Sequence, residues 1–138
     1  TDLVPEGGGT MGSRSLQHGG VAVHEAAEIL VEKARRQAAS LLEADEADVV
    51  LDKDTGAFHV TGTPAMSKTW ADLAVAAKSS GDPLLVAHNF TAAQASFPFG
   101  SHVAVVEVDT DTGQVRHVRH MACDDAGTML NPLLLEGQ

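Results

Sequence analysis

Small apolar residues recur at three- and four-residue steps across residues 21–44, and this repeat limits the possible folds more than any other feature of the chain. A period near 3.6 residues gathers such side chains on one face of an α-helix. Glu25, Glu28 and Glu32 fall between them, and we expect these carboxylates to form the solvent-exposed face. The repeat therefore predicts one long amphipathic helix. The repeating residues are Ala22, Val23, Ala26, Ala27, Leu30, Ala34, Ala38 and Leu41.

Two further stretches are typical of β-hairpins. In "DVVLDKDTGAFHV", residues 48–60, short β-rich runs flank the turn residues "DKDTG". In residues 102–122, alternating valines lead into "DTDTG", where Gly113 is available for a positive φ. Each pattern predicts two antiparallel strands joined by a tight turn.

The remaining signals predict a second helix and one more strand. Ser67 is a candidate N-cap for a helix over residues 68–78, which "SSGDP" would end, and "LLVAHNF", residues 84–90, has the character of a strand. The predicted fold is α+β, with two helices packed on a mixed, largely antiparallel sheet that includes two β-hairpins. The 138 residues suffice for one domain, and with 4% aromatic residues its core must rest on Ala, Val and Leu.

The net charge of -10 argues against binding to nucleic acid or to an anionic membrane surface. An anionic ligand would have to be held by local backbone N–H groups rather than by the overall field. The single cysteine, Cys123, excludes an internal disulfide and fits the cytoplasm. We expect no membrane span and no signal peptide, and "TDLVPEGGG" has the character of an internal loop.

The glycine-rich stretch "GGGTMGSRS", residues 7–15, has several possible roles. Its spacing matches a dinucleotide-binding fingerprint, but "TDLVPE" is a poor strand and "SRSLQHGG" is expected to separate the motif from the helix. The Lys of a Walker A loop is missing. Two readings remain open: a flexible linker, and a phosphate or pterin cradle in which backbone N–H groups are joined by Ser13, Ser15 and Arg14.

The histidines and paired aspartates do not predict a catalytic or metal site. His117 and His120 are three apart in a predicted strand, so we expect them to point to opposite faces. No metal-binding spacing of His or Cys occurs. Asp124 and Asp125 are expected to form a turn in which the aspartate side chain accepts hydrogen bonds from backbone N–H groups.

The order of the motifs resembles that of a known family. "GGGTMGSRSLQHGGVAVHEAA", "FHVTGTP" and residues 97–138, which end in "DDAGTMLNPLLLEGQ", occur in the order seen in the large subunit of the molybdenum hydroxylases. These are the relatives of xanthine dehydrogenase, aldehyde oxidase and carbon monoxide dehydrogenase. The resemblance implies that residues 1–138 are a single segment of a larger molybdopterin-binding domain, with a cofactor-loop region at 1–20 and an α+β body at 21–138.

This resemblance implies a redox function. The family's large subunit binds a molybdopterin cofactor, usually as the cytosine dinucleotide in bacteria, and hydroxylates a small-molecule substrate or oxidises CO. Electrons leave through 2Fe–2S clusters and FAD on partner subunits. The chain is then a portion of a molybdopterin-dependent oxidoreductase in the cytoplasm. Its partners would be the rest of the large subunit and the iron–sulfur and FAD subunits.

The resemblance also assigns residues to the cofactor site. Within the family's cofactor loop, Gly12, Ser13 and Ser15 match the positions whose backbone and hydroxyls hold the pterin and its phosphate side. Gln138 matches a glutamine whose amide contacts the pterin. The loop residues are Thr10, Met11, Gly12, Ser13, Arg14 and Ser15.

Other parts of the family's active site are not found in these residues. The catalytic glutamate lies downstream of "EGQ", so no catalytic residue is assigned, and Cys123 is in the wrong motif to be the active-site cysteine of carbon monoxide dehydrogenase. We expect the isolated chain to be inactive, to hold no cofactor and to self-associate through apolar surface around "MLNPLLLEGQ". The alternative is a non-catalytic α+β binding or assembly module that keeps the family's shape.

Overall fold

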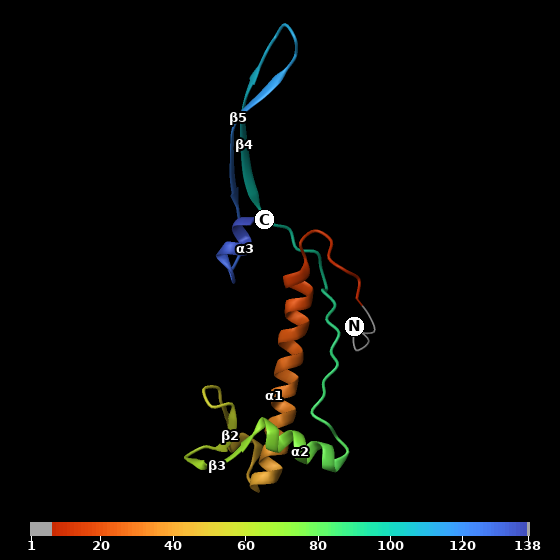
Figure 1. Ribbon diagram of the computed structural model, residues 1–138, viewed down its shortest axis with the longest axis vertical. Coiled ribbons are helices and arrows are strands. Elements are labelled where there is room, and N and C mark those ends of the chain that lie inside the picture. The colour runs from red at the N-terminus through yellow and green to blue at the C-terminus, as the bar shows by residue number, and fades with distance from the viewer. Residues whose placement is uncertain (1–6, 138) are drawn as a thin grey trace. The chain divides into compact units, whose positions relative to one another are not determined.

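The computed structural model describes residues 7–137, and the chain divides into two compact units at Ala92. The first unit holds two α-helices and a three-stranded antiparallel sheet, and the second holds a two-stranded antiparallel sheet and a short helix (Figure 1). The predicted α+β class and its two hairpins are confirmed, although the strands form two separate sheets.

The main helix of the first unit is α1 (Val21–Leu42), which ends two residues before the predicted position. Glu43 adopts the left-handed conformation with φ 52° and so terminates the helix. The Ala44 N–H donates to the carbonyl of Ala39 at 3.0 Å, which satisfies one of the last carbonyls.

The N-terminal end of α1 differs from the prediction. A π-helical turn, η1 (Leu16–Gly20), runs directly into α1, with Ser15 at its N-cap. The expectation that "SRSLQHGG" separates the glycine-rich loop from the helix is therefore wrong. Gly19 and Gly20 take part in the wide turn instead of breaking it.

The three-stranded sheet has the order β1 (Val49–Asp52), β2 (Ala57–Val60), β3 (Thr63–Thr69), and a 3₁₀ turn, η2 (Glu46–Asp48), precedes it. The predicted first hairpin is the β1–β2 pair. In its turn Asp52 accepts the N–H of Asp54 at 2.9 Å and the hydroxyl of Thr55 at 2.7 Å. These hydrogen bonds hold the tight connection between the strands.

The second helix, α2 (Trp70–Ser80), begins later than predicted because Thr69, not Ser67, is its N-cap. The Thr69 hydroxyl accepts the N–H of Asp72, and the Asp72 carboxylate accepts the N–H of Thr69 at 2.9 Å. This reciprocal capping box satisfies two backbone donors at the helix start. Gly81, with φ 79°, ends the helix.

The core of the first unit lies where the C-terminal half of α1 meets the sheet and α2. Ala34 and Ala38 have no exposed surface, and neither has the ring of Phe58, which meets Trp70 edge to face at 5.0 Å. Val23, near the other end of the predicted apolar face, is 71% exposed. The predicted apolar face is therefore buried only over its last turns. The buried residues are Ala34, Ala38, Ala39, Leu42, Val49, Phe58, Leu73 and Ala77.

The second unit consists of a long hairpin, β4 (Gly100–Val108) and β5 (Val115–Asp124), followed by α3 (Pro132–Gly137). Asp109 shapes the turn by accepting the N–H groups of Asp111 and Thr112 at 2.9 and 3.0 Å. The predicted second hairpin is confirmed. Both of its faces are exposed within this chain, including several valines on the strands.

The spacing of His117 and His120 predicted that they point to opposite faces of the strand, and this prediction is wrong. Their rings lie 6.2 Å apart, and the His120 ring is also 5.5 Å from that of His102. Val105 pairs with Arg119, but the next residue, Val106, pairs with His117, so Val118 is an extra residue in β5. A bulge of this kind puts both histidines on the same face of the strand.

Among the helices that the structure describes, none is long and apolar enough to cross a bilayer.

We predict that Phe58→Ala destabilises the first unit by about 3–5 kcal/mol, because it leaves a cavity at the centre of a small core. Denaturant unfolding of the purified chain measures this change. Val75→Ala, on an α2 residue that is 69% exposed, is the control and should change stability by less than about 0.5 kcal/mol. Similar unfolding midpoints for the two variants would contradict this account of the core.

We also predict that Thr69→Ala raises the pKa of Asp72. Hydrogen bonds from the Thr69 N–H and hydroxyl hold the pKa of Asp72 below its ordinary value of 3.8. The ionised carboxylate therefore stabilises the fold above about pH 4, and this contribution is lost as the pH falls further. NMR titration of the Asp72 carboxyl measures the effect, and an unchanged pKa in Thr69→Ala would refute the capping account.

Candidate functional site

The glycine-rich loop before the first helical turn has an unusual backbone. Gly9, Gly12 and Ser13 have φ values of 70°, 61° and 56°. Left-handed conformation suits glycine but is uncommon for serine, so two such residues in succession make a sharp turn. A Cβ atom added at Gly7, Gly9 or Gly12 would meet nothing within 4 Å, so open space lies beside the loop backbone.

Side chains within the loop hold it against the helix. Arg14 donates from Nη2 to the carbonyl of Gly9 at 3.3 Å, and the hydroxyls of Thr10 and Ser15 share a hydrogen bond. Ser15 makes no side-chain capping hydrogen bond, and the N–H of His18 donates to the carbonyl of Arg14 at 3.0 Å. The hydroxyls, the guanidinium and the positive end of the helix dipole thus gather at one place.

A groove of about 930 Å³ lies beside this loop. Its first wall is the loop, its floor is the first turns of the helix, and its second wall is the extended segment 85–90. Figure 1 shows the chain beyond α2 running beside α1 toward the N-terminal end of the helix. The volume is in the range of small-molecule and cofactor sites. The floor and second wall include the apolar residues Ala22, Val23, Ala26, Leu85, Val86 and Ala87.

Some of the predicted site residues line the groove and others do not. Thr10, Arg14 and Ser15 line the groove, whereas Met11, Gly12 and Ser13 belong to the same loop but are not in its lining. Gln138 lies outside the residues that the structure describes. The structure thus brings three of the predicted residues together around one space.

The second wall of the groove is not predicted by any sequence pattern. Segment 84–90 was predicted to be a strand, but it has no regular secondary structure and pairs with no strand. His88 and Asn89 line the groove, and the Phe90 ring meets the His18 ring edge to face at 6.0 Å. No local pattern marks these residues, because it is the path of the segment along α1 that brings them to the loop.

Glu25 corrects another expectation. It was assigned to the exposed face of α1 with Glu28 and Glu32, but its Oε2 lies 2.6 Å from Nε2 of His88. The side chains of His88 and Glu25 are 27% and 39% exposed, so the pair is partly shielded from solvent. Glu28 and Glu32 are exposed, as expected.

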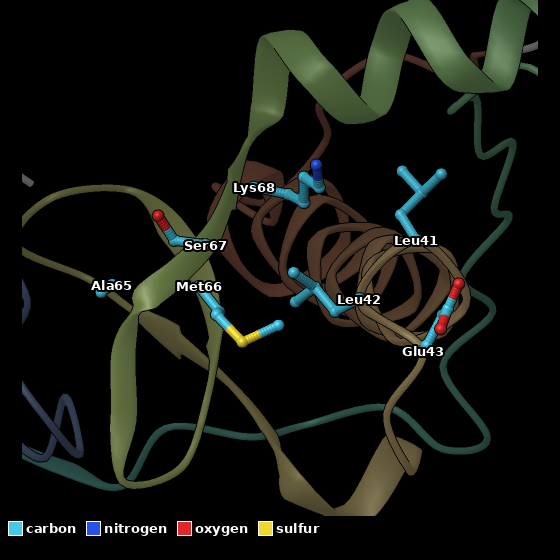
Figure 2. Close-up of a pocket in the computed structure, with 7 residues that line it drawn as sticks. All are labelled: Leu41, Leu42, Glu43, Ala65, Met66, Ser67 and Lys68. Carbon is cyan, nitrogen blue, oxygen red and sulfur yellow. The ribbon is translucent and has the colours of Figure 1, made fainter.

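A second hollow, of about 390 Å³, lies where the end of α1 approaches β3. Figure 2 shows the side chain of Met66 extending toward Leu42, with Glu43 and Lys68 on different sides. Its polar groups do not converge on a common point, so this hollow has no arrangement suited to binding a charged ligand.

The other candidate groups do not form a site. Asp125 accepts the N–H of Gly127 at 2.9 Å, which confirms the predicted turn for this residue. Asp124 is instead the last residue of β5, and its Oδ1 lies 2.9 Å from Nε2 of His102. Across residues 7–137, no three His, Cys, Asp or Glu side chains are arranged to hold a metal ion. The groove beside the glycine-rich loop is therefore the best candidate site.

Comparison with known proteins agrees with the resemblance. Residues 1–138 match the family model of the molybdopterin cofactor-binding domain. The carbon monoxide dehydrogenase large chain of Afipia carboxidovorans is 38% identical over all of this chain and 17% of the relative. The 6-hydroxypseudooxynicotine dehydrogenase complex subunit gamma of Paenarthrobacter nicotinovorans is 36% identical over all of this chain and 18% of the relative.

A solved structure extends the similarity to three dimensions. A crystal structure of Cu,Mo-CO dehydrogenase, in the carbon monoxide reduced state, matches with a TM-score of 0.68 and 36% identity over 99% of this chain and 18% of that chain. The chain therefore spans less than a fifth of the length of these relatives. From the match over its whole length, the chain belongs to the molybdopterin cofactor-binding domain family, as its motifs led us to expect.

Proposed function

We propose that this chain is part of the molybdenum-cofactor-binding large subunit of an oxidoreductase, a hydroxylase or dehydrogenase of the carbon monoxide dehydrogenase, xanthine dehydrogenase and aldehyde oxidase type. The observation that carries this proposal is the family match over residues 1–138. Within the chain, residues 1–20 form the cofactor-loop region and residues 21–138 the body that supports it.

The groove beside the glycine-rich loop suits an anionic cofactor. The open space at Gly9 and Gly12 allows a ligand to approach the backbone closely, and the hydroxyls and guanidinium supply hydrogen-bond donors. An acidic protein of net charge -10 needs such local donors to hold a phosphate. The residues that we assign to cofactor binding are Thr10, Met11, Gly12, Ser13, Arg14, Ser15 and Gln138.

In the reaction, the role of this chain is to bind and orient the cofactor. When bound, the molybdenum cofactor supplies the redox chemistry. The Arg14 guanidinium and the hydroxyls of Thr10 and Ser15 would hold its anionic groups, and the apolar floor at Ala22 and Ala26 would exclude water beside them. No residue of this chain is assigned a role in proton transfer.

The wider assembly follows from the same proposal. The cofactor takes the cytosine dinucleotide form, and partner subunits carry FAD and 2Fe–2S clusters. The rest of the large subunit completes the site and admits a small-molecule substrate, in the cytoplasm. The exposed valines of β4 and β5 support the need for such a neighbour, because a two-stranded hairpin alone is at best marginally stable in water.

We predict that Ser13→Ala combined with Ser15→Ala lowers the molybdenum content of the full large subunit. A hydrogen bond to a charged group contributes about 1.5–3 kcal/mol, so loss of both hydroxyls should weaken cofactor binding by more than tenfold. Elemental analysis of the purified subunit measures this. Ser79→Ala with Ser80→Ala is the control, since those hydroxyls donate to carbonyls of α2 at 3.0 Å. Full molybdenum content in the loop variant would refute the assignment.

We predict that the isolated 138-residue chain holds no stoichiometric molybdenum and forms oligomers. The groove supplies only part of a cofactor site, and the apolar side chains of β4 and β5 are uncovered. Elemental analysis and light scattering of the purified chain test this together. One molybdenum per chain, or a monomer at all concentrations, would contradict the corresponding part of the prediction.

A further inference from the structure

The second wall of the groove belongs to a segment that we call the strap, residues 82–90. At its start, Nζ of Lys33 on α1 donates to Oδ1 of Asp82 at 2.6 Å and to the carbonyl of Pro83 at 2.8 Å. Leu84 then packs against the core of the first unit. These contacts fix the strap where α1 is already buried.

The groove-lining part of the strap has a different anchor. Beyond Pro83 it has no ladder of backbone hydrogen bonds, because residues 84–90 join no helix or strand. The contact that ties its middle to α1 is the pair between Glu25 and His88, at 2.6 Å. Two residues later, the Phe90 ring meets the His18 ring across the head of the groove.

Chain geometry shows why this anchor matters. Lys33 and Glu25 are eight residues apart on a helix, which is about 12 Å of rise. The five residue-to-residue steps from Pro83 to His88 reach at most about 18 Å when extended. With both anchors formed, the two ends of this stretch are held beside α1 and its movement is restricted. Without the second anchor, residues 85–90 can move away from the glycine-rich loop.

We propose that Glu25 and His88 are positioning residues for the cofactor groove: the hydrogen bond between them holds residues 85–90 opposite the glycine-rich loop and so sets the width of the groove. This inference rests on the proposed cofactor-binding function. His88 lines the groove, whereas Glu25 does not and acts through its contact with His88. Neither residue belongs to the capping box of α2 or to the buried core.

The test compares variants of the full large subunit. Glu25→Ala removes the anchor, Glu25→Gln keeps an oxygen that can accept from His88, and the exchange Glu25→His with His88→Glu restores a histidine–carboxylate pair. Glu28→Ala is the matched control, since it removes an exposed carboxylate one turn further along α1, where its neighbour is His24 at 3.6 Å. Two measurements are made: the rate of molybdenum loss, and cleavage by chymotrypsin at the strap in cofactor-free protein.

We expect Glu25→Ala to lose molybdenum about fivefold faster and to be cleaved faster within residues 84–90, with Glu28→Ala unchanged in both. Glu25→Gln should recover most of the retention, and recovery in the exchanged pair would show that the contact itself is responsible. Unchanged molybdenum loss in Glu25→Ala would overturn the positioning role, whether or not cleavage increases. Unchanged cleavage would overturn the anchoring role.

The two proposals fail in different ways. If the Ser13 and Ser15 variant keeps its molybdenum, the cofactor loop is assigned wrongly. If strap cleavage in Glu25→Ala is then faster but its molybdenum loss is unchanged, the pair is an anchor without a role in cofactor binding, and the positioning role is overturned as well. If the loop variant loses molybdenum and Glu25→Ala does not, the proposed function stands and only the positioning role is overturned.

Discussion

The close packing of α1 on Phe58 is the contact on which the first unit depends. Ala34 and Ala38 have no exposed surface, and because they are small they let the helix backbone approach the sheet closely. Only the last turns of α1 are held in this way. The first turns remain available to form the floor of a groove, so the same helix supports the core at one end and the candidate site at the other.

The overall negative charge of the chain determines what kind of site can hold an anion. A chain of net charge -10 repels anions overall, so an anionic cofactor must be held by donors gathered at one point. The left-handed turn at Gly12 and Ser13 and the helical turn that begins after Ser15 provide that point. The hydrogen bond between Glu25 and His88 then holds the opposite wall near this point, which makes a half-buried carboxylate part of the site's support.

Local patterns predicted the long helix and both hairpins, because helical period and turn residues act over short distances. The assignment of the cofactor loop depended on the resemblance to a known family. Local patterns failed where distant parts of the chain decide the outcome. No local pattern predicted strand β3, and Thr63–Thr69 is extended because it pairs with β2. Segment 84–90 has the pattern of a strand, yet it runs beside α1 and pairs with no strand. The shared face of His117 and His120 depends on a bulge that no alternation pattern reveals.

The most direct test of the account is a crystal structure of the complete large subunit with its cofactor bound. The account predicts cofactor density in the groove between the glycine-rich loop and residues 85–90, with an anionic group within hydrogen-bond distance of Arg14 and Ser15. Cofactor density elsewhere, with the groove filled by another part of the polypeptide, would contradict it.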